Sequence, residues 1–235
     1  FNPGMGLIIN SLTFLIGFLV VCSLNIESND QKEKITSSKV FTDIKEGFIF
    51  VIHKKPILYT NLAMFFSIFG STLFLTMLVI HLKSTAGLDS ILIGYVLSIG
   101  GIAAIGGALI TNTLKKHFSY RTILFFASLV GGLSIIAFGM SNSFIWLALM
   151  NALGTISASI MNPCIVTIRQ KLTPNHSLGR VQATSRFMTW ILMPVAALTA
   201  GILAEQFSTA LTFFIGGIIA TIASFIYLHP SLKTA

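Results

Sequence analysis

The residues that could carry chemistry in this 235-residue sequence are few, and most of them are uncharged. The seven carboxylates all lie in polar segments or at the ends of apolar stretches: Glu27, Asp30, Glu33, Asp43, Glu46, Asp89 and Glu205. The five histidines also sit at the edges of apolar stretches, and no spacing among them matches a set of metal ligands. No nucleophile has a base at a suggestive spacing. The sequence therefore predicts no enzyme, no metal site and no cofactor.

Uncharged polar residues line one face of two predicted helices. Asn151, Thr155 and Asn162 follow one another at i, i+4 and i+11. An earlier stretch has a comparable face, made of Asn61, Phe65 and Thr72. An amide that faced lipid would carry a large free-energy cost, so both faces should point toward protein or a wet cavity. Interhelical hydrogen bonding and lining of a substrate cavity both explain this pattern.

A third group, Arg186, Trp190 and Met193, is spaced at i, i+4 and i+7. A basic residue followed by an aromatic one is typical of an anchor at a membrane interface. Trp190 and Met193 also suit contacts with an apolar ligand, because aromatic and thioether side chains adapt to varied shapes. Both interpretations stay open.

The composition places these residues in a membrane protein. Hydrophobic residues make up 54% of the chain and charged residues 9%, whereas soluble domains carry about 25% charged residues. A bilayer core of about 30 Å needs roughly 20 apolar residues in a helix. Seven stretches qualify: 3–24, 57–82, 91–114, 122–140, 144–168, 186–205 and 210–228. We therefore expect an all-α, polytopic membrane protein with seven transmembrane helices.

Small residues recur every fourth position or so in three of these stretches. This spacing predicts faces where two helices approach each other closely. The faces are Gly100, Ala104 and Gly107; Ala196, Ala200 and Ala204; and Gly216, Ala220 and Ser224.

One long polar run divides the chain into three parts. Residues 27–56 separate a single span in residues 1–26 from a bundle of six spans in residues 57–235. Within the polar run, apolar residues recur at helical spacing over residues 40–52 while charged residues take the other face. This pattern predicts a helix that lies in the membrane interface and ends before Pro56.

The basic residues are distributed unequally between the two sides of the predicted spans. If residues 27–56 are cytoplasmic, 14 of the 15 lysines and arginines lie on that side and only Lys83 lies on the other. We therefore expect a multi-pass protein of the cell membrane with a cytoplasmic C-terminus. Orientation and contact with anionic lipids of the bilayer explain the net charge of +8, and nucleic acid is not an expected partner.

Three stretches, taken in order, resemble parts of one known family. Residues 41–58, FTDIKEGFIFVIHKKPIL, look like a central-loop helix, and residues 106–121, GGALITNTLKKHFSYR, look like a glycine-and-basic loop motif. Residues 172–205 resemble the Pro, Gly-Arg-Val, Arg and Pro pattern that enters an eleventh helix. The family is the major facilitator superfamily, and in particular its branch of macrolide, drug and siderophore exporters. The acid of the loop motif has no counterpart here, and Leu178 replaces a common arginine.

The resemblance implies twelve helices in two pseudo-symmetric halves that rock around a central site. The first span would be the family's sixth helix and the other six its C-terminal half, so a missing N-terminal half of the same chain would be a partner. The second, third, fifth and sixth spans would face the cavity. The implied substrate-binding residues are Asn61, Phe65, Thr72, Asn151, Thr155, Asn162, Trp190 and Met193. The implied gating residues of the cytoplasmic loops are Lys115, Lys116, Arg121, Arg180 and Arg186.

We interpret the chain as part of a secondary transporter that exports hydrophobic or amphiphilic small molecules, such as macrolide-like drugs, in exchange for protons. Two alternatives stay open. One is a nutrient or siderophore permease of the same fold. The other is a membrane sensor or assembly module that does not transport.

Overall fold

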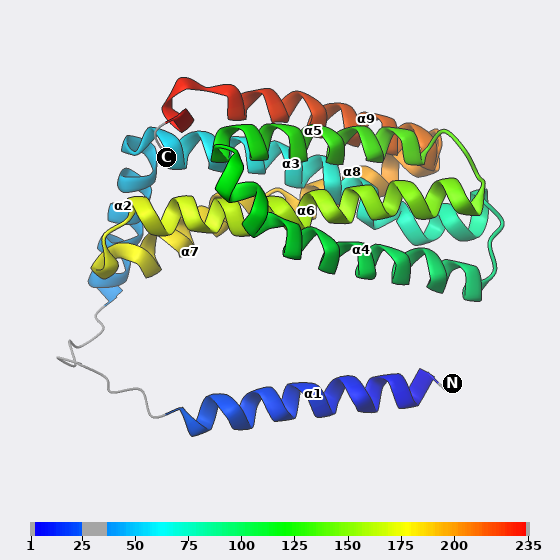
Figure 1. Cartoon of the computed structure of the whole chain (residues 1–235), viewed down its shortest axis with the longest axis horizontal. Coiled ribbons are helices and arrows are strands. Elements are labelled where there is room, and N and C mark those ends of the chain that lie inside the picture. Colours follow the sequence, from blue (N-terminus) through cyan, green and yellow to red (C-terminus); the bar gives the residue numbers. More distant parts are fainter. Residues whose placement is uncertain (1–2, 25–36, 234–235) are drawn as a thin grey trace. The chain divides into compact units, whose positions relative to one another are not determined.

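The computed structural model describes residues 3–24 and 37–233, and these residues form helices joined by short connections (Figure 1). Seven of the described helical segments are long and apolar enough to cross a membrane. The expectation of an all-α chain with seven membrane-length helices is therefore confirmed. The chain divides into two compact units, Phe1–Val40 and Phe41–Ala235.

The first unit contains helix α1 (Pro3–Ser23). No charged residue occurs in this helix, and its described side chains are all exposed. A helix that is apolar all round is covered by lipid or by other helices in a membrane protein. Its apolar segment, Gly4–Ser23, has the 20 residues needed to span a bilayer.

The second unit is a helical bundle in which successive membrane-length helices run in opposite directions (Figure 1), and it holds the remaining elements apart from the first residues of α2. They are α2 (Ser37–His53, of which residues 41–53 belong here), α3 (Lys55–Ile80), η1 (His81–Thr85), α4 (Ser90–His117), α5 (Tyr120–Phe138), α6 (Phe144–Leu172), η2 (Asn175–Ser177), α7 (Leu178–Trp190), α8 (Met193–Gln206), α9 (Thr209–Ser224), η3 (Phe225–Leu228) and η4 (Pro230–Lys233).

Several helices begin where a side-chain oxygen can accept a hydrogen bond from an otherwise free backbone N–H. The Asp89 carboxylate accepts one from the Leu92 N–H at 2.8 Å at the start of α4. Ser119 and Ser208 cap α5 and α9 in the same way. At the start of α3, Pro56 occupies the first turn, where its missing N–H costs no hydrogen bond.

The sixth predicted span differs from the expectation of one helix over residues 186–205. Its helical part begins at Leu178, and a short turn over Ile191 and Leu192 divides it into α7 and α8. Pro194 lies in the first turn of α8. The proline ring has no N–H to donate and clashes with the preceding turn, so the chain restarts a helix there instead of continuing one.

The fifth predicted span is also longer than expected. The sequence predicted residues 144–168, whereas α6 continues to Leu172. The extension brings Arg169 into the helix and buries it. The predicted end at residue 168 leaves Arg169 outside the span, whereas the helix continues because apolar residues recur at helical spacing through Cys164, Ile168 and Leu172.

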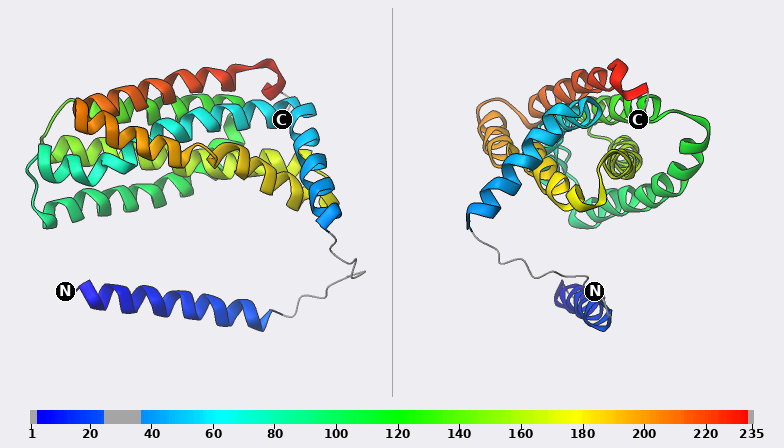
Figure 2. Two further views of the ribbon diagram at one scale, coloured as in Figure 1. Left: turned by 180° about the vertical axis from the view of Figure 1, so that it is seen from behind. Right: turned by 90° about the vertical axis from the view of Figure 1, so that its left-hand side faces the viewer.

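Within the second unit, α3 packs against α7, α8 and α9. Helix α5 packs against α6 and α9, and α4 packs against α6. The helix α2 lies across one end of the bundle (Figure 2). The α4–α5 and α6–α7 connections and η4 lie at the same end (Figure 1). Because Lys115, Lys116, Arg121 and Lys171 lie there, we call it the basic end.

The opposite end of the bundle is apolar and aromatic. Phe74, Phe138 and Phe213 come from three helices and meet edge to face, with ring centroids 5.0 to 5.6 Å apart. The buried ring of His81 lies against this cluster and forms a 2.7 Å hydrogen bond with Thr209. These contacts fix the end of α3 to the start of α9.

Candidate functional site

The predicted polar face of α6 joins that helix to α4. The Asn151 amide donates a 3.0 Å hydrogen bond to the carbonyl of Val96, and the Thr155 hydroxyl donates a 2.9 Å bond to the carbonyl of Gly100. Gly100 has no side chain, which leaves room for Asn151 against α4. Interhelical hydrogen bonding, one of the two explanations of this face, therefore describes Asn151 and Thr155. Their role in substrate binding stays a prediction.

A second polar group joins three helices near the basic end. Asn61 of α3 donates to the hydroxyl of Ser185 on α7 at 3.0 Å, and its carbonyl oxygen accepts a 2.7 Å hydrogen bond from Arg169 of α6. Arg169 also donates to Gln182 of α7 at 3.3 Å. We call these four residues the Arg169 cluster. It connects α3, α6 and α7 through a single guanidinium group.

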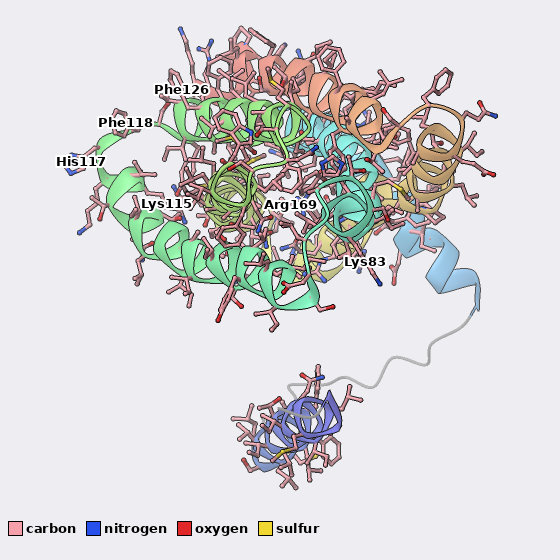
Figure 3. All side chains as sticks on the ribbon, turned by 90° about the vertical axis from the view of Figure 1, so that its right-hand side faces the viewer. Lys83, Lys115, His117, Phe118, Phe126 and Arg169 are labelled. Carbon is pink, nitrogen blue, oxygen red and sulfur yellow. The ribbon has the colours of Figure 1, made fainter. Side chains whose placement is uncertain are left out.

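The Arg169 cluster holds a buried positive charge. Arg169 is 4% exposed and Asn61 is 1% exposed, and Figure 3 shows Arg169 in the interior of the bundle. Within residues 3–24 and 37–233, no carboxylate lies within ion-pair distance of this arginine. Buried ionisable groups of membrane proteins are expensive and usually have a functional role. The sequence interpretation missed this residue, although the regular apolar spacing of α6 could have revealed it.

Other predicted substrate-binding residues lie at the surface of the second unit. Trp190 is 52% exposed and Met193 is 38% exposed, and they stand on either side of the break between α7 and α8. Asn162 of α6 is exposed, and Phe65 of α3 is partly buried. Thr72, in contrast, is buried within the bundle. Within the predicted set, the side chains of Asn61, Asn151 and Thr155 therefore join helices through hydrogen bonds, whereas Asn162, Trp190 and Met193 are exposed.

Among the predicted gating residues, Arg180 has the clearest partners. It pairs with Glu46 at 2.5 Å and with Asp43 at 3.4 Å, both on α2. Gly47 of α2 packs so closely against Arg180 and Thr184 that a side chain there would collide with α7. The apolar residues of α2 on its other side remain exposed, as expected of a helix that contacts lipid.

The other predicted gating residues lie in different environments. Lys115 donates a 3.3 Å hydrogen bond to Thr167 and so links α4 to α6. Lys116 and Arg186 are exposed. Arg121 is partly buried in the first turn of α5 and lines a cavity there. No group of His, Cys, Asp and Glu suited to a metal ion occurs in the part of the chain that was searched, residues 3–24 and 37–233.

Comparison with known protein families identifies the family to which the chain belongs. Residues 60–234 match the Major Facilitator Superfamily. The match covers most of the chain, including most of α3 and every described element after it. The chain belongs to this family and is a multi-pass membrane protein of the secondary-transporter type, which handles small-molecule substrates. No curated protein matches the chain.

Proposed function

We propose that the chain is the C-terminal half of an exporter for hydrophobic or amphiphilic compounds, as in the macrolide and drug branch of the family, and that it exchanges them for protons. In this proposal the basic end, with the C-terminus, faces the cytoplasm of a cell whose plasma membrane holds the protein. Asn162, Phe65, Trp190 and Met193 contact the substrate. In the same proposal, the Arg169 cluster holds α3, α6 and α7 together next to the bound substrate.

The observation that carries the proposal is the exposed side chain of Asn162 on a membrane-spanning helix. Among the described residues, this amide makes no hydrogen bond, and such a group would be costly in hydrocarbon. Asn162 is therefore best explained by a polar cavity. With Trp190 and Met193 also exposed, the surfaces offered to a ligand are uncharged and partly apolar, which suits an amphiphile.

The proposal is tested with the intact protein in cells that lack other exporters. We expect these cells to accumulate less of a lipophilic fluorescent dye and to survive more erythromycin than cells without the protein. A protonophore should abolish both effects. Asn162→Leu and Trp190→Ala should reduce export at unchanged abundance in the membrane. Phe214→Ala should not, because that exposed aromatic lies on α9, the seventh span, which is not among the spans implied to face the cavity.

Other outcomes would point to the alternatives. Faster accumulation of the dye would indicate a permease that imports its substrate. No change in accumulation for the dye, the macrolide or a siderophore would favour a sensor or assembly module.

The intact mass of the protein from its native membrane tests the proposed missing half, since a mass near double the 25.4 kDa of this chain is expected.

A further inference from the structure

A cavity of about 600 Å³ lies at the basic end, beside the first turns of α5. Arg121 and Thr122 line it from the first turn of α5, and Phe125 and Phe126 line it from the second. Leu228 and Lys233 come from η3 and η4, which follow α9. The cavity is therefore built where the start of α5 meets the last helical turns of the chain.

The polar half of this cavity is positively charged. Arg121 and Lys233 both line it, and neither pairs with a carboxylate in the described part of the chain. The Nε atom of Arg121 is buried and has no hydrogen-bond partner among the described residues. Of the described acids, Asp43 and Glu46 pair with Arg180, while Asp89 and Glu205 lie near the opposite end. An anion would meet two cations here, and none of the described residues offers a competing carboxylate.

The other half of the cavity is apolar and faces outward. Phe126 is 57% exposed, and Figure 3 shows it at the outer edge of the bundle, far from the interior position of Arg169. Phe125 packs edge to face against Phe225 of η3 at 5.6 Å and extends the apolar surface toward α9. A ligand that fills the whole cavity needs an anionic end and an apolar end.

We propose that this cavity binds an anionic phospholipid, with its phosphate between Arg121 and Lys233 and its acyl chains along Phe125, Phe126 and Leu228. The apolar half distinguishes a lipid from free phosphate, which would use only the charged half. The proposal does not depend on the substrate or on the direction of transport. It assigns a role to Arg121 that is separate from gating.

The test uses native mass spectrometry of the intact, delipidated protein titrated with phosphatidylglycerol or with phosphatidylcholine. We expect preferential binding of phosphatidylglycerol, and about fivefold weaker binding for each of Arg121→Gln and Lys233→Gln, since one basic residue contributes about that much at an anionic surface. Lys116→Gln is the matched control, because Lys116 is exposed near this end but does not line the cavity. It should weaken binding much less than either cavity variant, because its charge does not line the site that holds the phosphate.

Three results would overturn the proposal. They are equal binding of both lipids, an equal loss of binding in the Lys116→Gln protein, and full displacement of the lipid by millimolar inorganic phosphate, which would identify a free-phosphate site. The thermal unfolding midpoint of each variant should match that of the unaltered protein. If Arg121→Gln fails to fold, Lys233→Gln decides the matter, since this exposed residue lies in the last described turn.

Discussion

The two sides of the bundle join their helices in different ways. On the side of α9, glycines bring backbones into direct contact. Gly70 of α3 lies against Gly216 of α9, and Gly132 of α5 lies against Gly217 and Thr221 of α9, so closely that no Cβ atom would fit. On the side of α6, Gly107 of α4 also lies against the backbone of Ile156, but the contacts there include side-chain hydrogen bonds from Asn151, Thr155 and Arg169.

This difference separates a scaffold from a surface that could rearrange. Hydrocarbon offers no hydrophobic driving force between helices, so association depends on close packing or on hydrogen bonds. The glycine contacts have no side chain to exchange and permit a single arrangement. The polar contacts involve side chains that could change partners when helices move. Of the exposed candidates, Asn162 lies on α6 and Trp190 at the end of α7, two helices that the Arg169 cluster joins, and Met193 follows at the start of α8.

The largest effect is expected from a substitution that disrupts the glycine contacts on the side of α9. In Gly216→Leu the new side chain would collide with the backbone of Gly70, and α3 and α9 would have to separate. Overpacking costs about 1–3 kcal/mol in a well-packed core, and here the obstacle is backbone that cannot repack. We expect the protein to be nearly absent from the membrane fraction on an immunoblot. Gly101→Leu is the control, because nothing lies near that glycine on α4, and it should accumulate normally.

An intermediate effect is expected when the polar side is broken at the Arg169 cluster. Asn61→Leu removes the acceptor at 2.7 Å from Arg169 and leaves the buried charge with one oxygen partner fewer. A hydrogen bond to a charged group contributes about 1.5–3 kcal/mol, so the thermal unfolding midpoint in detergent should fall clearly. Asn162→Leu should leave the midpoint unchanged while reducing export. Equal midpoints for the two variants would contradict the division into buried and exposed amides.

The smallest effect is expected at the ion pair between α2 and α7. Arg180→Gln removes the contacts with Asp43 and Glu46, which are partly exposed and contribute about 0–1 kcal/mol. Stability should hardly change, but α2 should detach more often and become more sensitive to protease. High salt should have the same effect on the unaltered protein. Gly47→Leu should release α2 further, since its side chain would meet α7. Unchanged protease sensitivity in both variants would mean that these contacts do not hold α2.

The sequence predicted the helices well and their polar contacts only in part. The small residues Gly100, Gly107, Gly216 and Ala220 are buried at helix contacts, as their spacing predicted. The periodicity of a helix fixes which residues share a face, but it does not identify the helix that this face meets. The spacing of Asn151 is therefore compatible with a cavity and with a helix contact. Only the packing of the helices places α4 beside it.

Composition, apolar length and charge distribution by themselves determined an all-helical membrane protein with seven spans and one basic side. These properties depend on the transfer of whole segments into hydrocarbon, which is a sum over consecutive residues. Only the tertiary structure decided that Arg169 is buried, that it joins Asn61 to Gln182, and that Arg121 and Lys233 share a cavity. Such contacts join residues far apart in the chain, and their geometry exists only after the helices have packed.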